Sequence, residues 1–236
     1  MVTDMYLVNS NCSVTLARIG LGGFPLLVVD EFLLQPHKLK QWACECAEFS
    51  NDNSDFYPGL RAPLPQDYAA GLPAQIKPLL QSVMGASGLS LECLFHAFSL
   101  TITPPAQLKP IQCIPHFDDE NPLKLAMVLY LFEHEFGGTS FYRHNKTRFE
   151  ALTPENSDHY MKILMSQAST DGLPDAAYIN GDTRLFTRYH SVPAKFNRCI
   201  LYPSNILHSG DINPLIGLSA EPSKGRLTAN MALLMS

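Results

Sequence analysis

The sequence has few charged residues, no run of basic residues and no long apolar segment. Its 236 residues include 17 lysines and arginines against 22 aspartates and glutamates, a formal net charge of −5 at pH 7. A chain without a basic block lacks the electrostatic footprint of nucleic-acid and anionic-membrane binding. The longest uncharged apolar run, Leu125 to Phe132, is far shorter than the roughly 20 residues of a membrane-spanning helix. We therefore expect neither a nucleic acid nor a membrane as a partner.

Signals for secretion, disulfide frameworks and common cofactor sites are also missing. Asp4 stands where a signal peptide needs lysine or arginine, and no cysteines have C-x-x-C spacing. We therefore expect a cytoplasmic protein with reduced, buried thiols at Cys12, Cys44, Cys46, Cys93, Cys113 and Cys199. The sequence has no G-x-x-x-x-G-K-[ST], G-x-S-x-G or H-E-x-x-H motif. This argues against phosphate-binding loops, serine hydrolases and zinc proteases of those classes.

The residues that are present predict a folded α+β domain. Hydrophobic residues make up 46% and charged residues 17% of the chain, a balance typical of globular proteins. Helical spacing at Leu39, Trp42 and Cys46 predicts a helix over 36–49, a second helix follows Pro78, and Thr153-Pro154 opens an inserted helix over about 155–168. Apolar and β-branched segments predict strands at 24–30, 91–103, 124–132, 139–143, 198–202 and 226–234. We expect one domain over 1–236, with helical and strand support in 1–90, an antiparallel sandwich or barrel in 91–236 and an insertion over about 144–193.

One histidine has a carboxylate two residues later, in His116-Phe117-Asp118. On an extended chain, residues i and i+2 project from the same face, so both side chains can reach one metal ion. His208, just beyond the predicted strand 198–202, is the candidate third ligand. Two imidazoles and one carboxylate on one face of an ion form the site of non-haem Fe(II) oxygenases. A simple hydrogen-bonded His–Asp pair fits the H-x-D spacing equally well.

The last predicted strand alternates polar and apolar residues. Arg226, Thr228 and Asn230 share one face, and an arginine on such a face suits bidentate capture of a carboxylate. A solvent-facing edge strand would alternate in the same way. Lys224 shares the parity of Arg226 and is an alternative cation. Further candidates for ion pairs or for an anionic substrate are Arg143, Arg188 and Arg198.

Taken in order, five segments resemble the Fe(II)/2-oxoglutarate-dependent dioxygenases, and most of all their prolyl-4-hydroxylase-like branch. They are His116-x-Asp118, Val128-Leu-Tyr-Leu131, Phe136-Gly-Gly-Thr-Ser-Phe-Tyr142, Asn197-Arg-Cys-Ile-Leu-Tyr-Pro-Ser-Asn-Ile-Leu-His208 and Gly225-Arg226-Leu-Thr228. The resemblance runs from about Gln112 onward. Two features depart from the family pattern: the 18 positions between His208 and Arg226, and the long insertion after His144.

The resemblance implies a double-stranded β-helix, or jelly roll, with flanking N-terminal helices and an inserted helix. It implies that His116, Asp118 and His208 hold Fe(II), that Arg226, Thr228 and Tyr130 bind the cosubstrate 2-oxoglutarate, and that O2 is consumed. The implied reaction is hydroxylation of an amino-acid, peptide or small-molecule substrate, with release of succinate and CO2. The alternative is a cupin-like module that binds a metal or ligand without turning over 2-oxoglutarate.

Overall fold

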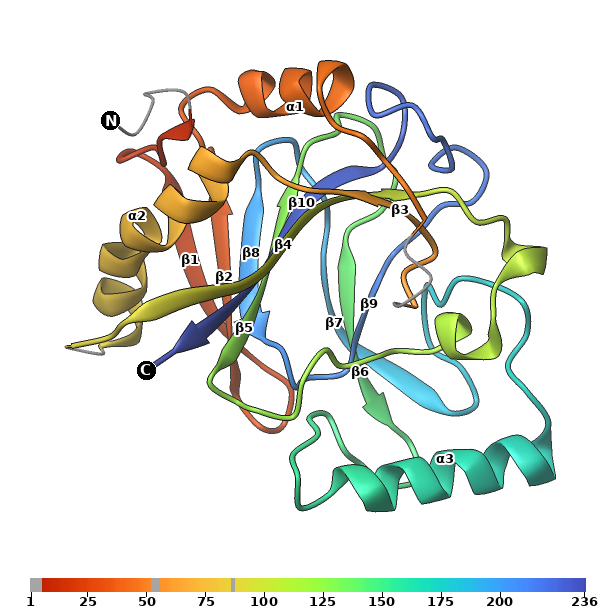
Figure 1. The fold of residues 1–236 in the computed structure, drawn as a ribbon. Coiled ribbons are helices and arrows are strands. Elements are labelled where there is room, and N and C mark those ends of the chain that lie inside the picture. The colour runs from red at the N-terminus through yellow and green to blue at the C-terminus, as the bar shows by residue number, and fades with distance from the viewer. Residues whose placement is uncertain (1–5, 52–55, 86–87) are drawn as a thin grey trace.

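The computed structural model describes residues 6–51, 56–85 and 88–236 (Figure 1). Within these residues the chain forms a seven-stranded sheet, a three-stranded sheet and three α-helices. All strand pairs are antiparallel, which confirms a strand-rich α+β fold with antiparallel sheets. In chain order the elements are β1 (Ser13–Ile19), β2 (Phe24–Asp30), α1 (Pro36–Glu45), β3 (Gly59–Ala62), α2 (Gln66–Met84), β4 (Leu91–Thr101), two short 3-10 helices (Pro105–Gln107 and Pro110–Cys113), β5 (Lys124–Tyr130), β6 (Thr139–His144), α3 (Ser157–Asp171), β7 (Phe186–Val192), β8 (Cys199–Pro203), β9 (His208–Gly210) and β10 (Leu227–Met235).

The large sheet has the order β1-β2-β8-β5-β10-β4-β3, and the small sheet has the order β7-β6-β9. Strand β10 therefore lies inside the large sheet, paired with β5 on one side and β4 on the other. The alternative interpretation of its alternating pattern, a solvent-facing edge strand, is therefore wrong. Its apolar residues Leu227, Ala229 and Met231 belong to the core beneath helices α1 and α2, so Thr228 and Asn230 point to the opposite face, because neighbouring strand residues alternate.

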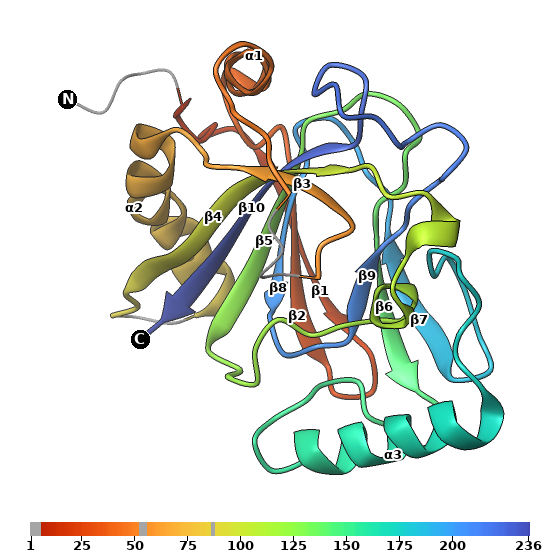
Figure 2. The same cartoon turned by 45° about the vertical axis from the view of Figure 1, so that its right-hand side comes forward.

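Two apolar layers sandwich the large sheet. The outer layer packs α1 and α2 against one face through residues such as Leu39 and Leu72. The inner layer lies between the two sheets, where Phe141 of β6 meets Tyr202 of β8 edge-on at 5.1 Å between ring centroids. The two sheets therefore lie next to each other with this inner layer between them, and both views show them as neighbours (Figures 1 and 2). The inner faces of the sheets thus form the space in which a site can be built.

Helix α2 begins earlier than the sequence predicts. It spans Gln66–Met84 and contains both Pro73 and Pro78 in its interior. Buried Tyr68, Leu72, Ile76 and Leu80 recur with helical spacing along it, so packing on the sheet outweighs the two backbone hydrogen bonds that prolines remove. Helix α1 ends earlier than predicted, at Glu45, and α3 spans Ser157–Asp171 with Asn156 in place of Thr153 at its N-cap.

The predicted insertion is part helix and part strand. Helix α3 packs on the outer face of the small sheet, where Tyr160 joins Tyr142 and Phe186 in a third apolar cluster, and it lies across the lower end of that sheet in Figure 1. Strand β7, which the sequence analysis did not predict, pairs with β6. The insertion therefore extends the small sheet and covers it.

The cysteines differ from expectation in their burial. All six are free, but only Cys113 and Cys199 are buried; Cys44 and Cys46 are exposed. Cys46 follows the last residue of α1 and does not continue the buried stripe of Leu39. The prediction of reduced thiols is compatible with the structure, and the prediction that all are buried is wrong.

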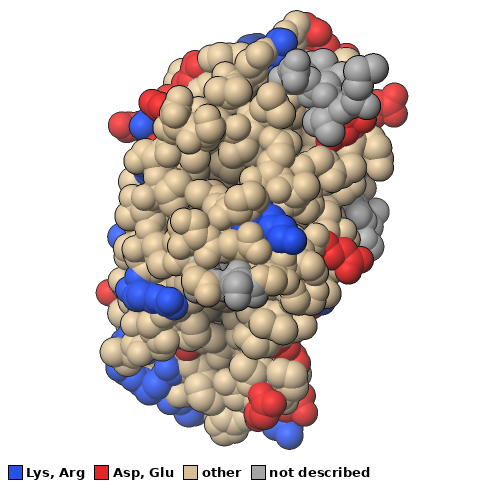
Figure 3. Space-filling view, turned by 90° about the vertical axis from the view of Figure 1, so that its left-hand side faces the viewer, with Lys and Arg blue, Asp and Glu red and all other residues tan. Residues whose placement is uncertain are grey.

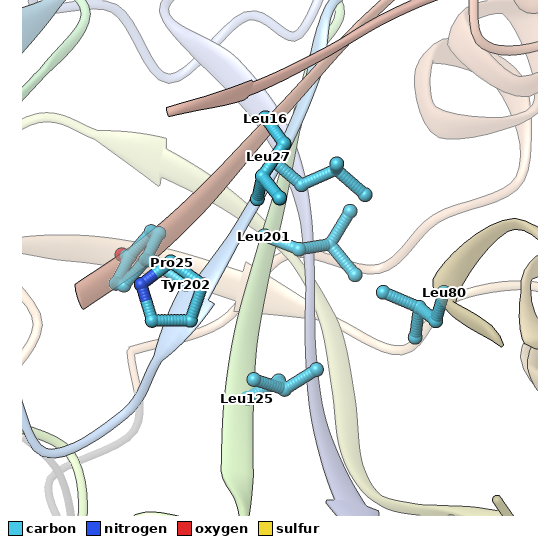
Figure 4. Close-up of a pocket in the computed structure, with 7 residues that line it drawn as sticks. All are labelled: Leu16, Pro25, Leu27, Leu80, Leu125, Leu201 and Tyr202. Carbon is cyan, nitrogen blue, oxygen red and sulfur yellow. The ribbon is translucent and has the colours of Figure 1, made fainter. Parts of the chain in front are cut away.

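The face shown in Figure 3 is uncharged over wide areas. Its lysines and arginines lie in separate groups, with a sizeable group at the lower left edge. Among the described residues no helix is both long and apolar enough to cross a bilayer. A small crevice (Figure 4) is lined by Leu16, Pro25, Leu27, Leu80, Leu125, Leu201 and Tyr202. Its lining is almost wholly hydrocarbon, so it offers apolar contact and no metal-ligating group.

Candidate metal centre

The structure brings His116, Asp118 and His208 together at the inner face. The segment before β5 runs antiparallel to the start of β9: the His116 amide donates to the His208 carbonyl at 2.9 Å, and the His208 amide donates back at 2.8 Å. The Asp118 amide donates to the Ser204 carbonyl at 2.8 Å. Because 116–118 is extended, His116 and Asp118 project to the same side, where they meet His208.

The ligand atoms of these three residues lie within 4.8 Å of one another. Asp118 lies between the imidazoles: its Oδ1 is 3.7 Å from His116 Nε2 and its Oδ2 is 3.6 Å from His208 Nε2. The two imidazole rings are 4.3 Å apart between centroids. Two ring nitrogens and one carboxylate oxygen thus point at one small volume, which is the donor set that a divalent transition metal accepts.

The hydrogen bonds of His208 fix which of its nitrogens is available to a metal. Its Nδ1 lies 2.9 Å from the Ile206 carbonyl oxygen. A carbonyl only accepts, so Nδ1 carries the hydrogen and Nε2 presents its lone pair toward Asp118 and His116. Orientation of a ligating histidine by a backbone carbonyl is the usual outer support of a metal site.

His116 lies at the open side of the cluster. Its side chain is 51% exposed, whereas that of His208 is 5% exposed. Partial burial of the imidazole and, secondarily, the neighbouring His208 lower the pKa of His116 from its ordinary value of 6.5 to about 4. The shift favours the neutral imidazole, the form in which histidine binds metal. The cluster is therefore closed behind His208 and open to solvent at His116.

Tyr202 forms the wall behind His208. Its ring meets the His208 imidazole edge-on at 4.8 Å between centroids, and burial, helped by the charge of Asp118, raises the pKa of its phenol well above the ordinary value. Tyr202 therefore stays neutral and fixes the imidazole plane from the side of the large sheet.

Arg226 lies on the same inner face and is buried, with 5% of its surface exposed. Its guanidinium donates to two backbone carbonyls, from Nε to Gly137 at 3.2 Å and from Nη2 to Gly138 at 2.7 Å. The rings of Phe132 and Tyr130 lie 5.6 and 5.9 Å from it. These partners hold the guanidinium in place, and none of them carries a negative charge. Lys224, by contrast, is exposed and pairs with Glu221 at 2.7 Å, so the structure does not support it as an alternative.

Tyr130 and Thr228 accompany Arg226. They are direct partners across β5 and β10, and both are buried. The Tyr130 hydroxyl lies 2.8 Å from Thr139 Oγ1, and burial is the main cause that raises its pKa to about 12. A buried cation, a phenol and a hydroxyl thus adjoin one another on the inner face of the large sheet.

A model of a protein family of unknown function, DUF6445, matches residues 10–233. The chain belongs to this family. None of the curated proteins matches it.

Some solved structures resemble this DUF6445 member in fold. One is the non-haem α-ketoglutarate-dependent epimerase SnoN from nogalamycin biosynthesis, with 13% identity, a TM-score of 0.49, and 92% of this chain and 78% of that chain covered. Another is the carbocyclase SnoK of the same biosynthesis, with 14% identity, a TM-score of 0.46, and coverage of 89% and 79%. A third is HygX from Streptomyces hygroscopicus with nickel and 2-oxoglutarate bound, with 12% identity, a TM-score of 0.45, and coverage of 89% and 82%. At identities of 12–14%, these likenesses concern the fold alone.

The sequence analysis missed an arginine on the inner face of this family member. Of the three arginines that it considered, Arg143 pairs with buried Glu150, Arg198 pairs with Asp30, and Arg188 donates to the Asn180 carbonyl. Arg61 is not among the predicted candidates, because β3 has only four residues and lies between Pro58 and Pro63. The alternation of Ser99 and Thr101 with apolar Phe98 and Leu100 in β4 is the signal that could have indicated a second strand with polar residues beside β10.

Proposed function

We propose that this DUF6445 member is a non-haem Fe(II)/2-oxoglutarate-dependent oxygenase. His116, Asp118 and His208 would hold Fe(II), and Arg226, Thr228 and Tyr130 would bind 2-oxoglutarate. In the proposed reaction a substrate C–H group, 2-oxoglutarate and O2 give C–OH, succinate and CO2. The substrate is an amino acid, a peptide or a small molecule.

A single observation carries this proposal: a three-ligand cluster with an open side shares its inner face with a buried arginine whose partners are neutral. Ligand atoms within 4.8 Å of one another fit one metal ion, and two imidazoles with one carboxylate match Fe(II) in an oxygenase. Among the residues that the structure describes, Arg226 donates hydrogen bonds only to the carbonyls of Gly137 and Gly138. A buried cation of this kind favours an anionic ligand, because burial of a charge without a counter-charge is costly.

The roles of the residues follow from their contacts. His208 is held in the metal-binding tautomer by the Ile206 carbonyl, and Asp118 supplies the anionic oxygen between the imidazoles. Arg226 would anchor the distal carboxylate of 2-oxoglutarate through its charge, with the Thr228 and Tyr130 hydroxyls beside it. Fe(II), when bound, would supply the redox chemistry of oxidative decarboxylation. The exposed side of His116 leaves an entrance for the substrate to be hydroxylated.

The course of the chain supports a double-stranded β-helix as the core of the proposed enzyme. From β5 onward the chain alternates between the sheets: β5 is in the large sheet, β6 and β7 in the small one, β8 in the large, β9 in the small and β10 in the large. We also propose that residues 1–236 form a single domain. In this domain, residues 1–90 support the β-helix and residues 144–193 are an insertion. Strands β1, β2 and β3 extend the large sheet within that support.

Succinate formation tests the proposal. Anaerobically purified protein is mixed with Fe(II), 2-oxoglutarate and O2, without a further substrate, and succinate is followed over time. We expect slow, iron-dependent succinate formation that is abolished by His208→Ala. If wild-type protein yields no succinate and Fe(II) does not change 2-oxoglutarate binding, the cupin-like alternative replaces the oxygenase.

A further inference from the structure

The turn between β8 and β9 supports two of the proposed metal ligands. The Ser204 carbonyl accepts the Asp118 amide at 2.8 Å, and the Ile206 carbonyl oxygen lies 2.9 Å from His208 Nδ1. Asn205 stands between the two residues that supply these carbonyls. Because peptide groups are planar, a rotation of the Asn205 backbone would re-aim the Ser204 carbonyl and displace Ile206. The orientation of both ligands therefore depends on how firmly Asn205 is held.

Asn205 makes two hydrogen bonds to the backbone of Leu152. Its main-chain carbonyl accepts the Leu152 amide at 2.8 Å, and its side-chain Nδ2 donates to the Leu152 carbonyl at 3.1 Å. Both residues are buried, with 3% of Asn205 and none of Leu152 exposed. Hydrogen bonds in a buried network of low dielectric rigidify their surroundings. The side chain of Asn205 thus adds a second restraint to the one that its backbone supplies.

Leu152 belongs to a segment that is itself anchored. It packs with Tyr160 of α3 in one apolar cluster. Two positions earlier, the buried carboxylate of Glu150 accepts a hydrogen bond from Arg143 Nε of β6 at 2.7 Å, and the Glu150 carbonyl accepts the Leu207 amide at 2.8 Å. The first part of the insertion is therefore a fixed support, and the Asn205 side chain joins the turn of the metal ligands to it.

Packing alone does not explain an asparagine at this position. Asn205 and Ser204 are almost wholly buried, yet Asn205 Oδ1 and Ser204 Oγ have no hydrogen-bond partner among the protein residues that the structure describes. Burial of a polar atom without a partner is unfavourable. An apolar side chain would avoid this penalty, but it could not donate to the Leu152 carbonyl. The hydrogen bond to Leu152 is the property that accounts for Asn205.

We propose that Asn205 is a positioning residue of the metal centre. It fixes the turn 204–206 to the insertion and so holds the Ser204 and Ile206 carbonyls in the directions that orient Asp118 and His208. Asn205 acts through these residues and is not a ligand. The proposal rests on the metal centre of the proposed function, and it gives the insertion, through Asn205, a share in metal affinity.

Two asparagines form a matched pair for the test. Asn205 Nδ2 donates to the Leu152 carbonyl from the turn of the metal ligands, and Asn156 Nδ2 donates to the adjacent Ala151 carbonyl at 3.3 Å from the start of α3. Calorimetric titration with Mn(II), without 2-oxoglutarate, measures metal affinity. We expect Asn205→Ala to weaken Mn(II) binding by about 10- to 100-fold, the effect typical of losing the outer support of a ligand. Asn156→Ala, which loses the corresponding hydrogen bond on the other side, should leave the affinity unchanged.

The His208 imidazole gives a second readout, which needs no metal. Its Nδ1–H is bonded to a buried carbonyl, so in metal-free protein its NMR signal should be protected from exchange with water. His208→Ala assigns the signal. Asn205→Ala should broaden or remove it, whereas Asn156→Ala should retain it. A merely structural role of Asn205 would lower the melting temperature and leave this signal in place.

Circular dichroism and melting temperatures confirm that each variant is folded. If Asn205→Ala does not fold, Asn205→Ser, which keeps a donor of shorter reach, replaces it and should also weaken Mn(II) binding. Unchanged Mn(II) affinity, an unchanged His208 signal, or equal effects of the Asn205 and Asn156 variants would overturn the positioning role and leave the metal centre standing.

Failure of the proposed function gives different results. Wild-type protein that binds no Mn(II) would refute the metal centre, and the role of Asn205 with it. Mn(II) binding that depends on Asn205 in a protein that forms no succinate would keep the positioning role and refute the oxygenase.

Discussion

The backbones of His116 and His208 donate hydrogen bonds to each other, at 2.9 and 2.8 Å. These residues are 92 positions apart in the sequence, yet this pair of backbone hydrogen bonds places their side chains next to each other. The Asp118 backbone amide likewise donates a hydrogen bond to the Ser204 carbonyl. Backbone hydrogen bonds therefore position all three residues of the cluster. Ligand substitutions should therefore affect metal affinity far more than they affect folding.

We expect His208→Ala and Asp118→Asn each to lower the affinity for Fe(II) or Mn(II) by about 100-fold or more, because the first removes a proposed imidazole ligand and the second removes the negative charge of the proposed ligand oxygen. Anaerobic isothermal titration calorimetry measures the affinity. His159→Ala, on exposed α3 and outside the cluster, is the matched control with unchanged affinity. Wild-type metal affinity in a folded His208→Ala protein would exclude His208 as a ligand.

Arg226 and Lys224 are two residues apart and differ in surroundings. Arg226 is buried on the inner face, and Lys224 is 68% exposed beside Glu221. We expect Arg226→Gln to raise the 2-oxoglutarate concentration needed for half-maximal succinate formation by roughly 100-fold, as loss of a bidentate charged contact predicts. Lys224→Gln should leave that concentration unchanged. The opposite pattern would move the anchor to Lys224.

Gly138 leaves no room for a side chain. A Cβ atom there would lie 1.9 Å from the Val192 carbonyl oxygen, and the Gly138 carbonyl is the acceptor of Arg226 Nη2. We expect Gly138→Ala to destabilise the protein by about 2 kcal/mol or more through overpacking and to weaken 2-oxoglutarate binding. Chemical denaturation and calorimetry check both effects. Gly181→Ala, where nothing lies within 4 Å of the added atom, should be nearly neutral, and equal stability of the two variants would contradict this account.

Asp30 joins β2 to β8 through Arg198, whose Nε and Nη2 donate to the two carboxylate oxygens at 2.6 and 2.9 Å. These hydrogen bonds are the main cause that holds the pKa of Asp30 below its ordinary value of 3.8. The pair therefore stabilises the fold above about pH 4, and its contribution is lost as the pH falls through the lowered pKa. Asp30→Asn should cost about 1–2 kcal/mol at pH 7 and progressively less in acid. A constant difference between pH 7 and pH 3 would contradict the assignment.

Local patterns in the sequence predicted much of the fold. The continuous apolar run of β2 and the alternation of polar Thr228 and Asn230 with apolar neighbours in β10 each indicated a strand correctly, because a buried strand is apolar throughout and a strand with two different faces has a period of two. The H-x-D spacing likewise indicated that His116 and Asp118 share a face, and the structure places them there beside His208.

Other features depend on contacts between distant segments and could not be predicted. Helix α2 contains Pro73 and Pro78, which ordinarily end a helix, and it is stabilised by a sheet that no local window contains. Strand β3 has only four residues, too few for a periodic signal, so the position of Arg61 stayed hidden. The closeness of Arg61 to Ser99 is a property of strand order and register.

The place of β10 in the large sheet also determines when that sheet can be completed. It is the last strand along the chain, yet it alone connects β4 and β3 to β5 and β8. Before it pairs, Arg61 and Ser99 belong to a ribbon of two strands, while His116, Asp118 and His208 belong to the rest of the molecule. A nascent or proteolysed chain that stops short of Arg226 lacks this connection, so the strands on the two sides of the gap do not share one sheet.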